Sequence, residues 1–248
     1  MSRRGLSVEE DDRWIFNRLA ADYAARPGYP AALVDRVVAL GGGAGGRVAD
    51  LGAGTGLLSV ALAGAGLLVE AVEPARAMLA ALGTPPPGLT PVQATAEATG
   101  LPDGAFDLVV LADALHWTDA ALAGREAARL LRPGGAVAVI EPRFAGTPFM
   151  SALAGLLAAA NPKARRRPLP LGLFFSSAGR GRFTTERFEQ AVPLEPSRLE
   201  AVLRSLSVVG PALGPDGVER LLGEARALAA RCGGAGWART LLLHRAGG

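Results

Sequence analysis

Three glycines alternate with other residues in the segment VADLGAGTG, which spans residues 48–56. An apolar run typical of a buried strand leads into them, and helical spacing follows over Thr55–Ala63. Glycines at a strand-to-helix turn let the backbone approach a ligand closely, and free N–H groups at the helix start point toward it. Leu57 stands where a dinucleotide site has its third glycine, and no Gly-Lys-Ser/Thr ending of a phosphate loop follows. The turn therefore departs from both phosphate-binding patterns.

Two carboxylates accompany this turn and indicate the charge of its ligand. Asp50 lies two residues before Gly52, close to where a diphosphate would lie, and a carboxylate there repels phosphate but attracts an ammonium or a sulfonium. Glu73 ends the next predicted strand, about 20 residues further on, where a carboxylate can accept hydrogen bonds from both hydroxyls of a ribose. Together they predict a nucleoside with a positive, phosphate-free tail, and S-adenosylmethionine (SAM) is such a molecule.

Strands and helices that alternate along the chain must position these residues. Apolar runs predict strands at residues 47–51, 67–73, 89–93, 106–112 and 136–141. Helical spacing predicts helices within 8–30 and at 31–40, 55–63, 75–82 and 120–131. This alternation is typical of βαβ units, so the predicted fold class is α/β, with a doubly wound, Rossmann-like, mostly parallel sheet and helices on both faces.

The chain has 248 residues, half of them hydrophobic, which suits a single domain. We expect a helical cap at residues 1–40, a cofactor-binding core at 47–141, an insertion with helices that shapes an acceptor pocket at 142–235, and an antiparallel final strand within 236–246. The alternation weakens after Glu141, where the pattern predicts a strand within 183–194 and helices at 198–206 and 218–231.

Five segments of the chain occur in an order that resembles a known family. They are DYAARPGYP, DLGAGTG, the VEP that ends the second strand, ATAEATGLPDGAFDLVVLADALHW and LRPGG. This series resembles the class I SAM-dependent methyltransferases, and within them it is most similar to the small-molecule methyltransferase-11 type. The resemblance covers about residues 14–141 and implies methyl transfer from SAM to a small organic acceptor by in-line displacement, with S-adenosylhomocysteine (SAH) as product.

The resemblance also implies which residues contact the cofactor. The glycine turn would hold the methionine end, Glu73 the ribose, and Thr95 and Ala96 the adenine, although many relatives have Asp at the position of Thr95. The expected cofactor residues are Tyr23, Arg26, Asp50, Gly52, Ala53, Gly54, Gly56, Glu73, Pro74, Thr95, Ala96, Glu97 and Asp113. Two alternatives remain open at this point: Glu73 could cap the following helix, and Arg26 could be an exposed charge at a helix end.

The segment after the fourth predicted strand contains the candidate catalytic residue. Ligands of open α/β sheets bind beyond the carboxyl ends of the strands, and His116 lies there; histidine suits proton transfer because the unperturbed pKa of this residue type is near 6.5. We expect His116, Trp117 and Tyr29 to contact the acceptor, with His116 as a candidate base. The alternative is that His116 and Trp117 only pack the loop or line the pocket.

The residue composition of the chain limits the classes of function that are expected. Cys232 is the only cysteine and the two histidines are far apart, so no metal site and no intramolecular disulfide is expected. Glycines interrupt the apolar run of residues 47–74, and the first 14 residues lack the apolar region of a signal peptide. We therefore expect a cytoplasmic protein without a membrane partner, either a monomer or a homodimer.

Three other functions stay open on the sequence. The basic cluster KARRR at residues 163–167 could neutralise phosphates in an RNA methyltransferase, but it lacks the aromatic residues that stack on bases, so no nucleic-acid partner is expected. Cofactor motifs report binding rather than chemistry, so a SAM-binding protein without methyl transfer, or a fold reused for cyclisation, is a second alternative. A NAD-dependent oxidoreductase is the weakest.

Overall fold

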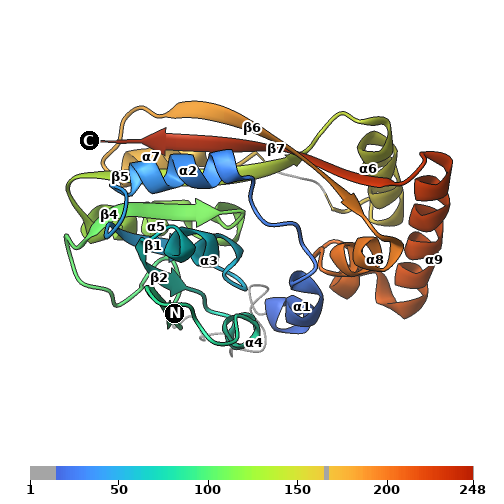
Figure 1. Cartoon of the computed structure of the whole chain (residues 1–248), viewed down its shortest axis with the longest axis horizontal. Coiled ribbons are helices and arrows are strands. Elements are labelled where there is room, and N and C mark those ends of the chain that lie inside the picture. Colours follow the sequence, from blue (N-terminus) through green and yellow to red (C-terminus); the bar gives the residue numbers. More distant parts are fainter. Residues whose placement is uncertain (1–14, 165–167, 248) are drawn as a thin grey trace, which may run out of the picture.

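The computed structural model describes residues 15–164 and 168–247, and a mixed seven-stranded sheet forms its centre (Figure 1). The strand order is β3-β2-β1-β4-β5-β7-β6. The strands are β1 (Arg47–Leu51), β2 (Leu68–Val72), β3 (Leu89–Val92), β4 (Phe106–Ala112), β5 (Leu131–Phe144), β6 (Thr184–Leu194) and β7 (Ala235–Ala246). The first five strands are parallel, whereas β7 pairs antiparallel with both β5 and β6. The predicted fold class is confirmed.

Helices cover both faces of this sheet. They are α1 (Phe16–Tyr23), α2 (Ala31–Leu40), α3 (Leu57–Gly64), α4 (Arg76–Ala81), α5 (Ala120–Leu130), α6 (Pro148–Ala160), α7 (Leu171–Ser177), α8 (Pro196–Arg204) and α9 (Gly210–Arg231), with a short 3₁₀ turn at Leu115–Trp117. None of these helices is both long and apolar enough to cross a membrane, among the residues that the structure describes.

The alternation of side chains along the strands explains the two faces. Val48 and Val110 point to one face, where they pack with α2 and α3, while Ala49 and Leu111 point to the other, where they pack with α5 and α7. Both faces are buried, which is why the central strands are continuous apolar runs rather than alternating ones.

A third hydrophobic cluster lies away from the parallel strands. It joins α6, α8 and α9 to Trp237 and Ala238 of β7. Figure 1 shows these helices gathered at one end of the long strands β6 and β7, with α1 between them and α4. Through α8 and α1, this cluster supports the segment that covers the ligand-binding side of the sheet.

Some element boundaries differ from the predictions. The helix after the glycines begins at Leu57 rather than Thr55, because Gly56 has a left-handed backbone (φ 80°). The strand expected at residues 136–141 extends over the whole of β5, because β7 pairs with it as far as Phe144 and Phe106 of β4 pairs with Leu131 at its start. Of the helix expected within residues 8–30, α1 is described; residues 8–14 lie outside the described part of the chain.

Two helices, α6 and α7, lie where the sequence pattern gave no assignment. Helix α6 is uncharged, so it lacks the polar stripe by which an amphipathic helix is recognised. Its start nevertheless carries a local signal: the side chain of Thr147 accepts a hydrogen bond from the backbone N–H of Met150, and Pro148 occupies the first turn.

Candidate active site

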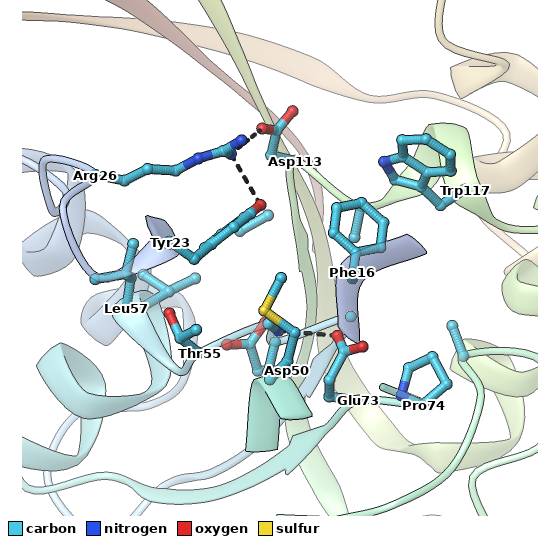
Figure 2. Close-up of a pocket in the computed structure, with 18 of the residues that line it drawn as sticks. Phe16, Tyr23, Arg26, Asp50, Thr55, Leu57, Glu73, Pro74, Asp113 and Trp117 are labelled. Atoms are coloured by element: carbon cyan, nitrogen blue, oxygen red, sulfur yellow. Dashed lines mark hydrogen bonds and ion pairs between the residues drawn. The ribbon is translucent and has the colours of Figure 1, made fainter. Parts of the chain in front are cut away.

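A cavity opens at the carboxyl ends of β1, β2 and β4, the edge where ligands of open α/β sheets bind. It encloses about 990 Å³ of empty space including its open mouth. Its walls come from α1 and the following RPGYP turn, the glycine turn, the end of β2, the loop after β3 and the segment after β4 (Figure 2). Pro142 and Arg239 contribute from the C-terminal half of the chain.

Most of the residues predicted for the site line this cavity. They are Tyr23, Arg26, Tyr29, Asp50, Gly52, Ala53, Gly54, Glu73, Pro74, Thr95, Ala96, Glu97, Asp113 and Trp117. Gly56 does not line it, since it is the N-cap of α3. His116 does not line it either.

The glycine turn needs residues without side chains. Gly52 and Gly54 have φ values of 75° and 59°, a region that other residues seldom adopt. A Cβ on Gly52 would also lie 2.6 Å from the Cβ of Ala114, so this glycine lets the turn after β1 approach the segment after β4. The two walls of the cavity are thereby brought together.

Asp50 is completely buried at the floor of the cavity, at the end of β1. The hydroxyl of Ser59 donates to its Oδ2 at 2.6 Å, while Oδ1 has no partner among the described residues. Burial raises the pKa of Asp50 to about 6, against the hydrogen bond from Ser59, and the nearby charge of Glu73 adds to the rise. The hydroxyl of Thr55, also at the cavity, is likewise buried without a described partner. An unpartnered, desolvated carboxylate oxygen of this kind favours a cationic ligand.

Glu73 holds the glycine turn against the start of α4. Its Oε2 accepts a hydrogen bond from the N–H of Gly54 at 3.0 Å, and its Oε1 accepts one from the N–H of Ala75 at 2.9 Å. The side chain also lines the cavity and is largely buried, which raises its pKa. Glu73 therefore bonds the N-terminus of α4, as one of the two alternatives expected, and each carboxylate oxygen keeps a second lone pair with which it could accept a hydrogen bond from a ligand.

Arg26 is tied into the wall of the cavity and is not an exposed charge. Its Nη1 donates to the hydroxyl of Tyr23 at 2.8 Å and lies 3.7 Å from Oδ2 of Asp113 (Figure 2). Its Nε and Nη2 donate to the hydroxyl and carbonyl oxygens of Ser205, which follows α8. Asp113 itself has a positive φ of 55°, a costly conformation for a residue other than glycine. These contacts join α1, α8 and the end of β4 around one corner of the cavity.

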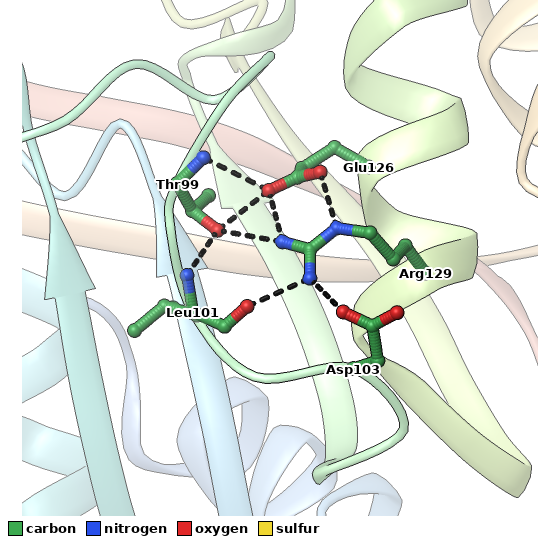
Figure 3. Close-up of polar contacts among 5 residues, drawn as sticks. All are labelled: Thr99, Leu101, Asp103, Glu126 and Arg129. Carbon is green, nitrogen blue, oxygen red and sulfur yellow. Dashed lines mark hydrogen bonds and ion pairs between the residues drawn. The ribbon is translucent and has the colours of Figure 1, made fainter.

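The loop that carries Thr95, Ala96 and Glu97 is held from behind by a polar cluster (Figure 3). Glu126 of α5 accepts hydrogen bonds from both the N–H and the hydroxyl of Thr99, at 2.8 and 2.6 Å. Arg129, one turn further along α5, bonds Glu126 at 2.6 and 2.8 Å and also donates to the carbonyl of Leu101 at 2.7 Å. The hydrogen bonds from Arg129 lower the pKa of Glu126 to about 2. The sequence analysis did not identify this cluster.

The 3₁₀ turn after β4 separates two neighbouring residues that were both expected at the acceptor. Trp117 lines the cavity, and Phe16 of α1 meets its ring edge-on with centroids 5.0 Å apart (Figure 2). His116 is exposed on the outer side of the turn. The geometry therefore gives the hypothesis of His116 as a base no support, whereas Phe16, Met78 and Arg239 line the cavity without having been predicted.

Residues 49–139 match the family model described as a methyltransferase domain, Methyltransf_11. These residues are similar to the methyltransferases that the model describes. They contain the glycine turn, Glu73 and the segment after β4, so the resemblance indicated by the sequence motifs is confirmed. The cavity lies where these motifs converge.

The chain is similar both to curated methyltransferases and to solved structures. Over 139 residues the chain is 43% identical to uncharacterized methyltransferases of Mycobacterium tuberculosis and Mycobacterium bovis, a match that covers 56% of this chain and 54% of each relative. The chain thus spans about half the length of the curated relatives it matches. A proposed type II methyltransferase from Anaeromyxobacter dehalogenans shares 25% identity and a TM-score of 0.61, over 90% of this chain and 97% of that chain.

A third neighbour shows the fold alone. Phosphoethanolamine N-methyltransferase 2 of Haemonchus contortus, solved with phosphomonomethylethanolamine and SAH, has 15% identity and a TM-score of 0.50. The match covers 96% of this chain and 58% of that chain.

Proposed function

We propose that this protein is a SAM-dependent methyltransferase that acts on a small organic acceptor. The observation that carries the proposal is Asp50, which lines the cavity and whose buried Oδ1 has no hydrogen-bond partner among the described residues. A desolvated carboxylate beside the glycine turn opposes a pyrophosphate and suits the positive methionine end of SAM. The family of the domain and the SAH bound to a structural neighbour support the same cofactor.

The residues of the cavity fit the parts of this cofactor. Asp50 and the unpartnered hydroxyl of Thr55 would meet the charged methionine end, and the free lone pairs of Glu73 would meet the ribose. Thr95, Ala96 and Pro74 would contact the adenine. When bound, the cofactor would supply an electrophilic methyl group on a sulfonium: the nucleophile of the acceptor bonds to the methyl carbon in line, and SAH leaves with the electrons of the C–S bond.

The residues of the cavity would contribute mainly by positioning the acceptor and excluding water. The leaving group is already activated, so holding the acceptor behind the methyl group and desolvating it account for much of the rate. The rings of Phe16 and Trp117 meet edge-on and form an apolar part of the cavity wall. Where the acceptor arrives protonated, the carboxylate of Asp113 is the basic group placed at the end of β4 to receive the proton.

Calorimetric titration with SAM, SAH and NAD tests the cofactor, and transfer of a labelled methyl group to a metabolite extract tests the reaction. We expect SAM and SAH to bind and NAD not to bind. Asp50→Asn should weaken SAM by about tenfold or more, a loss typical of removing one partner of a buried charged contact. Binding of NAD, or SAM affinity that is the same in Asp50→Asn, would contradict the proposed site. Tight SAM binding with no methyl transfer would instead favour a SAM-binding protein without transferase activity.

A further inference from the structure

Arg239 lines the cavity from β7, outside the core that carries the glycine turn and Glu73. It pairs with Phe144 of β5 on one side and with Gln190 of β6 on the other. Its side chain lines the cavity together with Tyr29, Pro142 and Asp113. This wall lies at the carboxyl ends of β4 and β5, next to the positions expected for the acceptor.

The guanidinium of Arg239 is fixed by neutral groups. Its Nη2 donates to the carbonyl oxygens of Gly28 and Pro27 at 2.8 and 3.1 Å, and its Nε donates to Oε1 of Gln190 at 3.0 Å. The amide of Gln190 in turn donates to the carbonyl of Gly28 at 2.9 Å. No residue within 15–164 or 168–247 accepts a hydrogen bond from Nη1 of Arg239. The position of the guanidinium is therefore set, while one of its donor groups is left for a ligand.

The charge of Arg239 also lacks a counter-ion in the described structure. Arg26, the other arginine of the cavity, has Oδ2 of Asp113 at 3.7 Å. No described carboxylate lies within 4.0 Å of the guanidinium of Arg239. Burial lowers the pKa of Arg239, and the nearby Tyr29 and Asp113 partly oppose this lowering. Buried or half-buried charges in proteins are normally paired. A fixed and unpaired guanidinium that faces a cavity is the arrangement expected where the ligand brings the negative charge.

We infer that Arg239 binds an oxyanion of the methyl acceptor, so that the acceptor is an organic acid carrying a carboxylate or a phosphate. The inference rests on the proposed function and names its substrate class. Arginine suits this task because its planar fork of donors matches the oxygens of either group. Tyr29 adds a second donor: its ring lies 5.9 Å from the guanidinium carbon, and burial raises the pKa of its hydroxyl, which stays protonated at neutral pH.

A labelled-methyl assay on fractionated metabolites tests this substrate class without a variant. A bacterial metabolite extract is separated by ion exchange at pH 7 into anionic, neutral and cationic fractions before the reaction, and each fraction is incubated with the protein and methyl-labelled SAM. The label should enter products of the anionic fraction. Phosphatase treatment of that fraction separates the two sources of charge, because it abolishes labelling for a phosphate acceptor and leaves it unchanged for a carboxylate acceptor.

Variants then test whether Arg239 is the group that binds the negative charge of the acceptor. Arg239→Gln should raise the KM for the active fraction by about tenfold or more, as expected for the loss of a charged hydrogen bond, while the Kd for SAM changes less than about twofold. Gln190→Ala is the matched control, since it removes a hydrogen bond from the same wall and keeps the charge; because the carbonyls of Pro27 and Gly28 still hold the guanidinium, its KM should rise clearly less than that of Arg239→Gln. Circular dichroism of each variant reports whether the fold is kept.

Each outcome separates the inference from the proposed function. Labelling of the neutral or cationic fraction would overturn the acid acceptor and leave methyl transfer standing, whereas no label from any fraction would overturn both. An equal loss of SAM affinity in Arg239→Gln would assign Arg239 to the cofactor instead. If Gln190→Ala raises KM as much as Arg239→Gln, the arginine only supports the turn at Pro27 and Gly28, and the inference fails.

Discussion

Replacement of Asp50 by Asn should stabilise the free protein while it weakens the binding of SAM. An aspartate in an unfolded chain has a pKa near 3.9, whereas burial raises that of Asp50 to about 6 in the folded protein. The difference of about 2 pKa units corresponds to roughly 3 kcal/mol by which ionised Asp50 destabilises the fold. The amide in Asp50→Asn would keep an acceptor for the hydroxyl of Ser59 and carry no charge. We expect Asp50→Asn to increase the free energy of unfolding by about 1–3 kcal/mol near pH 8. The gain can be smaller than the full value of roughly 3 kcal/mol because burial of the polar amide also has a cost.

The sign of the pH dependence makes this prediction specific. A carboxyl whose pKa is raised on folding contributes stability below its unfolded pKa, and this contribution is lost as the pH rises through the folded value. The advantage of Asp50→Asn should therefore be near zero at pH 4, grow between about pH 4 and pH 6, and stay constant above pH 7. Other groups titrate in both proteins alike, so the difference between variant and wild type isolates Asp50.

Urea unfolding at a series of pH values measures this difference, and Asp35→Asn provides the control. Asp35 is exposed on α2, so its replacement should change stability by less than about 0.5 kcal/mol at any pH. An Asp50→Asn variant that is less stable than the wild type at pH 8, or whose advantage does not depend on pH, would refute the argument that the carboxylate is desolvated and unpaired. Since a cation relieves the same cost, SAM affinity of the wild type should also fall as the pH drops below about 6.

Three further changes test other parts of the site. Glu126→Gln should lower the free energy of unfolding by about 1–3 kcal/mol and raise the Kd for SAM, because the loop it holds carries the adenine contacts; thermal melts and calorimetry measure both. Gly52→Ala should abolish SAM binding and cost more stability than Gly83→Ala, which has a similarly positive φ but open space around the added Cβ; equal costs would show that close approach to Ala114 is unimportant. His116→Gln should leave kcat within about twofold in the labelled-methyl assay, because the residue is exposed and does not line the cavity.

The part of the site that could be predicted is the part encoded by neighbouring residues. The turn around Gly52 and the acid at the end of β2 each combine a strand end with a local pattern, so their positions follow once the parallel sheet is assumed. His116 and Trp117 show the limit of this reasoning. The 3₁₀ turn determines that Trp117 lines the cavity while the adjacent His116 does not. The sequence contains no periodic pattern from which this difference between the two side chains could be predicted.

Contacts between distant segments were not predictable for a different reason. Arg239 reaches the carbonyls of Pro27 and Gly28 because β7 enters the sheet beside β5, more than 200 residues along the chain. In the sequence it is one arginine in an apolar strand, which is more often a surface charge. Glu126 and Arg129 have a spacing that predicts a pair on one helix face, but their partners at Thr99 and Leu101 depend on how the loop packs against α5.

The charges of the cavity are divided in a way that couples the two proposed ligands. Asp50 and Glu73 lie beside the glycine turn, where the proposed cofactor would bind, and the guanidinium of Arg239, which has no described carboxylate within 4.0 Å, lies at the wall that also contains Tyr29, Pro142 and Asp113. A cationic donor held by the carboxylates adds a positive charge between them and Arg239. An acid acceptor would then be attracted both by Arg239 and by the sulfonium, an attraction that strengthens as water leaves the site. An amine acceptor would meet repulsion from both. Binding of SAM should therefore increase the affinity of the cavity for an acid, whereas binding of SAH should not, because SAH lacks the sulfonium charge. This difference between SAM and SAH should persist in part when Arg239 is replaced, since the sulfonium still attracts the acid.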